Sequence, residues 1–123
     1  MIPSTAFMTQ GLLYDRDGRP LGLLADGVSG FATLTNSGQV VAAQAGFKIR
    51  VYALSVSALL ATAVKLQSNS TDVSFVMSLA STGGFVLPQA NAGWFETAVG
   101  EALNLNMTVA TTVGVQVIYA LVR

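Results

Sequence analysis

The sequence predicts an all-β protein, an antiparallel β-sandwich arranged as a jelly roll of about eight strands behind an extended N-terminal arm. Three observations lead to this prediction. From about residue 31 onward, apolar residues recur at every second position, which is the period of half-buried strands. Clusters of Asn, Ser and Gly separate these runs at short intervals. The segment before them has no such period, so we divide the chain into an arm at residues 1–30 and a β-sandwich domain at residues 31–123.

The N-terminal arm has a composition of its own. Three of the six acidic residues and two of the six basic residues lie between Asp15 and Asp26. The pair Asp17-Gly18 predicts a tight turn, with short apolar clusters on both sides. Asp15, Asp17 and Asp26 form the only acidic cluster of the sequence. The run DRDG resembles the start of a calcium loop, but the third ligand and the terminal Glu are missing, so a turn is the stronger interpretation. An irregular segment with scattered apolar residues is most simply an arm that lies on a partner.

The first half of the sandwich domain is expected to contain four strands. FATLTNSGQVVAA places a turn at residues 36–38 between two short strands. Residues 47–58 alternate apolar and basic side chains at their start, and residues 61–68 continue as a strand into a turn at 68–70. Good helix formers in SVSALLATAV make a helix the alternative there, but the Ser-Val alternation favours a strand.

The second half predicts four further strands, at about residues 72–80, 84–88, 103–109 and 113–123. A turn at residues 82–84 and Pro88 bound the second of them. The stretch WFETAVGEAL could form a helix instead. Alternation assigns three sets of side chains to shared faces: Val73, Phe75, Met77 and Leu79; Leu103, Leu105, Met107 and Val109; and Val113, Val115, Val117, Tyr119 and Leu121.

The low charge content predicts that much of the surface is covered by other subunits. Only 10% of the residues are charged and 52% are hydrophobic, whereas soluble domains average about 25% charged residues. A small monomer has a large surface to cover, and obligate subunit interfaces are apolar. The formal net charge is zero, so the chain lacks the basic surface that nucleic-acid binding requires.

A membrane protein is the competing explanation for the low charge. The uncharged run between Glu101 and Arg123 is long enough to span a bilayer as a helix. It contains Asn104, Asn106 and Gln116, however, and its apolar residues alternate, which disfavours a transmembrane helix. The first ten residues have neither the basic start nor the apolar core of a secretory signal.

Few residues offer catalytic chemistry. The chain has no histidine and no cysteine, which excludes thiolate catalysis and leaves carboxylates as the only general bases near neutral pH. Glu96 and Glu101 lie beside the only tryptophan, Trp94, and could form a glycosidase pair with a sugar-stacking aromatic. The alternative is a bend at Gly100 with a solvated Glu on each side, and we favour it. We therefore predict no enzymatic activity, with no catalytic, cofactor-binding or metal-binding residue.

Four runs resemble, in this order, small virion proteins of tailed bacteriophages: FKIRVYALSVSALLATAVKLQS, LASTGGFVLP, WFETAVGEALNLN and VGVQVIYALV. Such proteins are compact, often jelly-roll-like β-sandwiches that decorate or cement capsids or form the heads of short fibres, usually as trimers. The resemblance covers roughly residues 46–122 and leaves out the arm. It rests on structural residues and not on a catalytic signature, and sandwiches of many functions share such residues.

The resemblance implies a decoration or cement protein on the outer surface of a phage capsid, made in the bacterial host cytoplasm. It would stabilise the head by bridging coat subunits, with the major capsid protein and further copies of itself, as a homotrimer, for partners. No direct nucleic-acid or membrane partner is implied. Residues of the arm without an evident core to fill are expected to dock on the capsid: Phe7, Leu12, Leu13, Tyr14, Arg16 and Arg19. Residues of the terminal strand are expected to mediate self-association: Ile118, Ala120 and Val122.

Two alternatives remain open. The first is a receptor-binding or glycan-binding tip of a fibre, in which Trp94 and the neighbouring turns form the contact surface. The second is a hydrolase that uses Glu96 and Glu101, which requires both carboxylates to flank one scissile bond.

Overall fold

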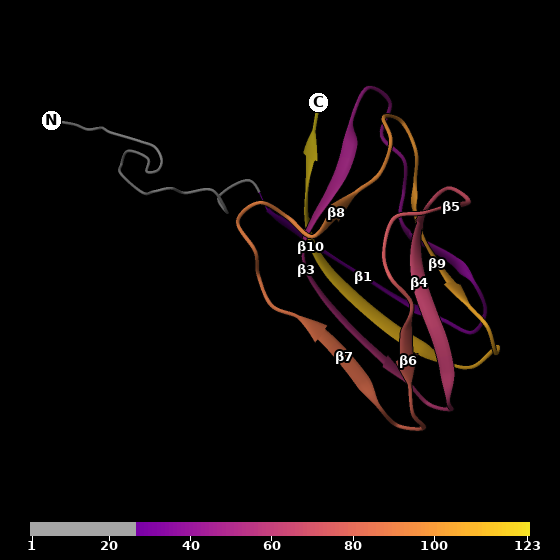
Figure 1. The fold of residues 1–123 in the computed structure, drawn as a ribbon. Coiled ribbons are helices and arrows are strands. Elements are labelled where there is room, and N and C mark those ends of the chain that lie inside the picture. The colour runs from indigo at the N-terminus through magenta and orange to yellow at the C-terminus, as the bar shows by residue number, and fades with distance from the viewer. Residues whose placement is uncertain (1–26) are drawn as a thin grey trace, which may run out of the picture.

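The computed structural model describes residues 27–123, which form two antiparallel β-sheets packed face to face (Figure 1). The predicted all-β sandwich is confirmed, and no helix occurs within the described residues. Accordingly, nothing in residues 27–123 is a helix that could cross a membrane. The first strand begins at Val28, so the first sheet includes three residues that the sequence assigned to the arm.

The first sheet is built around its two longest strands. Its order is β1 (Val28–Leu34), β10 (Val113–Val122), β3 (Lys48–Ala58) and β7 (Gly84–Leu87). The short strand β8 (Phe95–Glu96) also pairs with β3. β3 and β10 therefore lie in the middle of this sheet, with β1 at one border.

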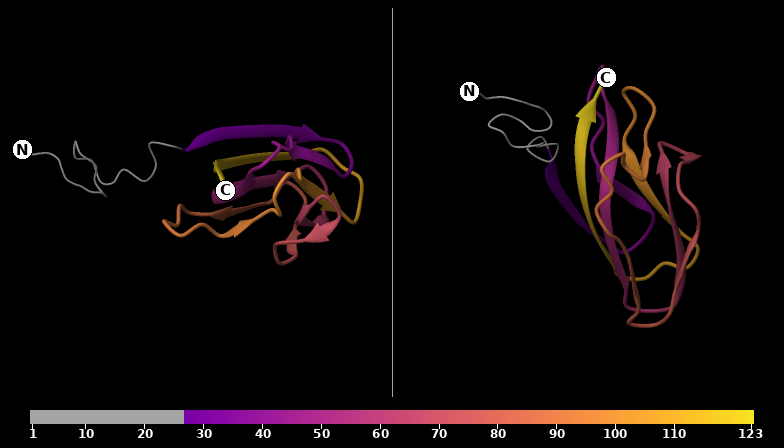
Figure 2. Two further views of the ribbon diagram at one scale, coloured as in Figure 1. Left: turned by 90° about the horizontal axis from the view of Figure 1, so that it is seen from above. Right: turned by 60° about the vertical axis from the view of Figure 1, so that its left-hand side comes forward.

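The second sheet covers the inner face of the first. Its order is β2 (Gly38–Val41), β9 (Leu103–Met107), β4 (Thr62–Ser68) and β5 (Thr71–Asp72). β6 (Met77–Leu79) also pairs with β4. Two further views of the ribbon show the two layers (Figure 2).

The strand pairing is that of a jelly roll. Along the chain, the outermost pair is β1 with β10, followed by β2 with β9, β3 with β7, and β4 with β6. The chain thus forms one long two-stranded ribbon whose successive pairs lie in alternate sheets. Such a double-sheet arrangement of eight strands is the jelly roll that the sequence predicts. β5 and β8, of two residues each, are additions to it.

The inner faces of both sheets form one hydrophobic core, because successive side chains of a strand point to opposite faces. Leu66 and Leu103 of the second sheet and Ile49 of the first are each 0% exposed. The predicted alternation is confirmed in β9 and in the first half of β10 by a set of buried side chains: Leu103, Leu105, Met107, Val113, Val115 and Val117.

A bulge in β3 changes which residues face the core. The register with β10 passes from Ala53 opposite Ile118 to Val51 opposite Tyr119, which leaves Tyr52 as an extra residue on β3. Side chains on either side of an extra residue change phase. Even-numbered residues such as Leu54 are therefore buried after the bulge, whereas Val51 is buried before it.

Three residues of the predicted faces lie outside the core. Leu121 is 41% exposed near the end of β10. The other two lie outside the strands. Val109 is 52% exposed because β9 ends at Met107 and the chain turns away before reaching it. Phe75 is 52% exposed because β5 and β6 are separate short strands, and its ring meets Phe85 edge to face at 5.8 Å. In both cases the apolar alternation extends beyond the hydrogen-bonded strand.

Leu66→Ala is expected to lower the free energy of unfolding by about 2–5 kcal/mol, because it leaves a cavity between the two sheets. The matched control is Leu60→Ala in the β3–β4 turn, where the side chain is 55% exposed and the change should stay within about 0.5 kcal/mol. Urea denaturation of both variants measures the difference. Equal losses would contradict the assignment of the core to the inner faces.

Candidate functional site

Trp94 is held in a fixed position on the loop that leads into β8. Its backbone N–H donates to the carbonyl of Val51 at 2.8 Å, and its indole Nε1–H donates to the carbonyl of Pro88 at 2.7 Å. The side chain nevertheless remains 41% exposed. A half-exposed aromatic ring that is already immobilised can make a contact at a low cost in side-chain entropy.

Gly93 allows this loop to approach the sheet closely. Its φ is +84°, and a Cβ atom there would lie 2.8 Å from Cγ of Arg50. Both the backbone angle and the space therefore favour glycine. Its N–H donates to the carbonyl of Ala90 at 3.0 Å, which closes the turn before Trp94.

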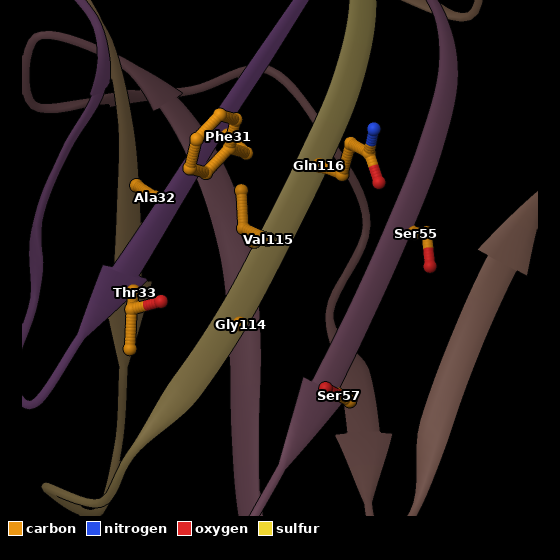
Figure 3. A pocket seen from close by; sticks show the side chains of 8 residues that line it. All are labelled: Phe31, Ala32, Thr33, Ser55, Ser57, Gly114, Val115 and Gln116. Atoms are coloured by element: carbon orange, nitrogen blue, oxygen red, sulfur yellow. The ribbon is translucent and has the colours of Figure 1, made fainter.

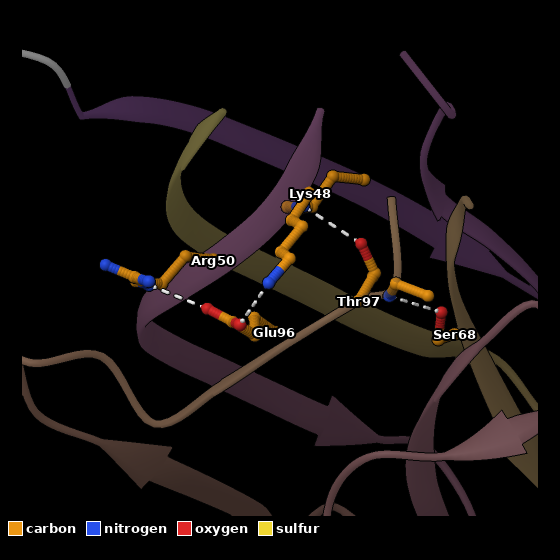
Figure 4. Close-up of polar contacts among 7 residues, drawn as sticks. Lys48, Arg50, Ser68, Glu96 and Thr97 are labelled. Carbon is orange, nitrogen blue, oxygen red and sulfur yellow. Dashed lines mark hydrogen bonds and ion pairs between the residues drawn. The ribbon is translucent and has the colours of Figure 1, made fainter. Parts of the chain in front are cut away.

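Glu96 joins two basic residues of β3 (Figure 4). Its Oε1 accepts from Nε of Arg50 at 2.9 Å and its Oε2 accepts from Nζ of Lys48 at 3.3 Å. Arg50 lies opposite Glu96 in the β3–β8 pairing, and Lys48 lies two residues along the same face. Each of the three side chains is about one-third exposed, so solvent screens these ion pairs.

The charges in this cluster stabilise one another. The hydrogen bond from Arg50, with a smaller contribution from Lys48, holds the pKa of the Glu96 carboxyl below its ordinary value. Glu96, and to a lesser extent the Tyr52 hydroxyl, in turn raises the pKa of the Arg50 guanidinium. A carboxyl that stays ionised in this way is a poor general acid.

The residues after Glu96 bridge the two sheets. The Thr97 hydroxyl accepts the N–H of Ile49 in the first sheet at 2.9 Å (Figure 4). The buried Ser68, at the end of β4 in the second sheet, accepts the N–H of Ala98 at 2.9 Å and donates to Oε1 of Glu101 at 2.5 Å. The segment from Glu96 to Glu101 is therefore a corner fastened to both layers.

The positive φ of Gly100, +76°, turns the chain at this corner, as the sequence predicts. Its N–H donates to the carbonyl of Phe47 at 2.8 Å. Glu96 and Glu101 lie on opposite sides of this turn and bond to different sheets. Both carboxylates serve as acceptors in structural contacts, and neither bonds to the other. Within residues 27–123, no group of three or more acidic, His or Cys side chains gathers that could hold a metal ion.

An open hollow of about 380 Å³ lies on the outer face of the first sheet. Figure 3 shows the side chains from β1, β10 and β3 that line it. It is bordered by exposed residues or small side chains, chiefly Phe31, Thr33, Gly114, Gln116, Ser55 and Ser57. Phe31 is 79% exposed, more than any other large apolar residue in the described part of the chain. Phe31 is not among the residues that the sequence predicts for a site. The signal that could have found it is its position in the strand on the face opposite to Ala32 and Leu34.

The predicted self-association residues lie at the far end of β10. Ile118 and Val122 are partly exposed, whereas Ala120 is only 7% exposed and is covered by its own chain. Ala120 therefore has little surface to offer to a second copy. The six predicted capsid-docking residues, Phe7, Leu12, Leu13, Tyr14, Arg16 and Arg19, lie outside the described residues, as does the predicted turn at Asp17-Gly18 with its neighbouring acids Asp15 and Asp26.

Glu96→Gln is expected to reduce stability at neutral pH and to make little difference in acid. Because folding lowers the pKa of Glu96 from 4.5, its contribution is complete above that value and is lost as the pH falls through the lower folded value. Solvent screening limits the effect to less than about 1 kcal/mol. Urea denaturation of both proteins at pH 7 and pH 3 measures it. A variant whose stability relative to wild type does not depend on pH would contradict the ion cluster.

Comparison with protein-family models, with curated proteins and with solved structures finds no match for this chain. Arguments about function therefore depend on the geometry of the molecule. The resemblance to phage virion proteins keeps the status of a prediction from the sequence.

Proposed function

We propose that this protein is a structural subunit of a tailed-phage virion, a decoration protein on the outer surface of the capsid. It stabilises the head by bridging coat subunits and assembles with further copies of itself. The observation that supports the proposal best is an uncharged sheet surface on a compact sandwich. The resemblance of residues 46–122 to small virion proteins points in the same direction.

The outer face of the first sheet is unlike a surface that faces solvent. Residues opposite one another in an antiparallel pair share a face, so the register defines its members beyond the Tyr52 bulge. None of them is charged: Ser29, Phe31, Thr33, Ala53, Ser55, Ser57, Gly84, Val86, Gly114, Gln116 and Ile118. Phe31 and Val86 are 79% and 66% exposed. Depletion of charge with exposed apolar side chains is the composition of a protein interface.

The sandwich suits a mechanical role. Its core residues are 0–8% exposed, and close-packed interiors deform little under load. The corner from Glu96 to Glu101 ties both sheets together, so force on one layer reaches the other. In this proposal the N-terminal arm before β1 binds the coat. The sequence-based expectation for the assembly is three subunits around a capsid three-fold axis.

The capsid proposal predicts that Leu12→Ser with Leu13→Ser abolishes binding to heads, because these two apolar residues are expected to dock on the coat. The chain offers a matched control in another Leu-Leu pair, Leu59 and Leu60, which are 57% and 55% exposed in the β3–β4 turn. Co-sedimentation with purified heads that lack the protein measures binding of both variants and of wild type.

Retention of the Leu59→Ser, Leu60→Ser variant in the head fraction, with loss of the arm variant, supports the proposed docking. Heads that do not retain the wild-type protein would contradict capsid decoration itself. Heads that retain both variants equally would contradict the role of the arm and leave decoration standing.

A second candidate function is a glycan-binding or receptor-binding tip, favoured by the fixed and 41% exposed ring of Trp94. Aromatic rings offer a flat apolar surface for a sugar ring. If the protein has this function, Trp94→Ala should lower its affinity for a bound glycan at least about ten-fold on a glycan array. Phe75 is a similarly exposed aromatic residue, at 52%, and Phe75→Ala should leave the affinity unchanged. An array on which the wild-type protein binds no glycan would rule this candidate out.

A further inference from the structure

Strands at the border of a sheet can pair with other chains, and most borders of this sandwich are protected against it. Natural edge strands are protected by shortness, charge, proline or a bulge. β2 has four residues and a register shift between Gln39 and Val41. β7 has four residues and is followed by Pro88. β5 and β8 have two residues each and include Asp72 and Glu96, and β6 has three residues.

β1 has none of these protections. It has seven residues, VSGFATL, without a charge or a proline. Its register with β10 runs without a shift from Val28 opposite Tyr119 to Leu34 opposite Val113. Figure 2 shows β1, in indigo, along the border of the sheet. In the part of the chain that the structure describes, no strand pairs with its other edge.

We propose that this edge of β1 pairs antiparallel with β1 of a second copy, across a two-fold axis at Phe31. Phe31 is the central residue of Val28–Leu34. Symmetric pairing about Phe31 places this residue opposite Phe31 of the second copy. A residue that lies a given number of positions before Phe31 then faces the residue that lies the same number of positions after Phe31 in the second copy. The sheets of the two copies then continue into one another.

The residues brought together by this register are compatible at every position. On the outer face, the two Phe31 rings meet each other and Ser29 meets Thr33. On the inner face, Gly30 meets Ala32 and Val28 meets Leu34. Aromatic pairs, hydroxyl pairs and aliphatic pairs all stabilise antiparallel strands, and no like charges meet. The same seven residues therefore form a self-complementary strand, which is the reason to choose a second copy as the partner.

Pairing also accounts for Phe31, whose ring is 79% exposed on a single subunit. Against a second Phe31 the ring loses much of its contact with water. The uncharged parts of the two outer faces then join into one surface, because residues opposite one another in an antiparallel pair share a face. A two-fold contact pairs subunits, so the assembly contains an even number of them, either two chains or two trimers.

The mass of the full chain in solution, measured by light scattering and native mass spectrometry, tests the pairing directly. A mass of two or six subunits is the expected result. One or three subunits would overturn the proposal, including the case in which residues 1–26 of the same chain cover the edge. The measurement uses the purified protein alone, so its outcome is independent of capsid binding.

A matched pair of variants then locates the contact. Phe31→Lys places two like charges opposite each other and should raise the Kd of pairing at least about ten-fold. Val86→Lys puts the same charge on the same outer face, on β7 instead of β1, at a residue that is also largely exposed, 66%, and should leave the Kd unchanged. Dissociation of the Val86→Lys protein, or persistence of the Phe31→Lys pair, would overturn pairing through β1.

Mixing tests the register itself. Phe31→Glu should dissociate as Phe31→Lys does, since each variant repels its own copy. An equimolar mixture of the two should regain the paired mass, because unlike charges now meet at the two-fold axis. A mixture that stays unpaired would overturn the register centred on Phe31. Circular dichroism confirms that each variant is folded before it is mixed.

Discussion

The antiparallel pairing of β3 with β10 is the interaction on which the rest of the sandwich depends. These two strands are the longest within residues 27–123, and their register continues from Val113 opposite Ala58 to Val122 opposite Lys48 with one shift. β1 attaches to the free side of β10, and β7 and β8 attach to the free side of β3. Because of the bulge in this pair, Ile49 and Val51 before it and Leu54 after it all face the same core. A change in the register would expose all three.

The corner after β8 shows how few polar side chains this protein needs. The described part of the chain has seven charged residues. Among them, Glu96 forms ion pairs with Arg50 and Lys48, and Glu101 accepts a hydrogen bond from Ser68. Hydroxyls of Thr97 and Ser68 satisfy backbone N–H groups where the chain leaves the sheet. Charged side chains are therefore found at this corner and beside it on β3, while the outer face of the first sheet beyond the Tyr52 bulge carries none.

Alternation in the sequence predicted most strands because burial of one face imposes a period of two. It placed Leu105 and Val115 correctly and failed at Phe75 and Val109, where apolar residues continue past the last hydrogen-bonded pair. The bulge at Tyr52 and the strand pairing depend on contacts far apart in the chain, which no local pattern encodes. For the candidate site, the turn at Gly100 was predictable from the residue type. The partners of Glu96 were not, since Lys48 and Arg50 lie in a distant strand.

The ribbon topology also governs when the domain can close during synthesis. Of the strands that the structure describes, β1 leaves the ribosome first, and β10, with which it pairs, leaves last. Domains are made at about 5–20 residues per second, so β1 stays without its partner for several seconds while β2 to β9 are translated. Over that time both of its edges lack the partner that β10 provides. Because β1 carries no charge that would prevent pairing with another chain, premature pairing has to be avoided until β10 has been translated.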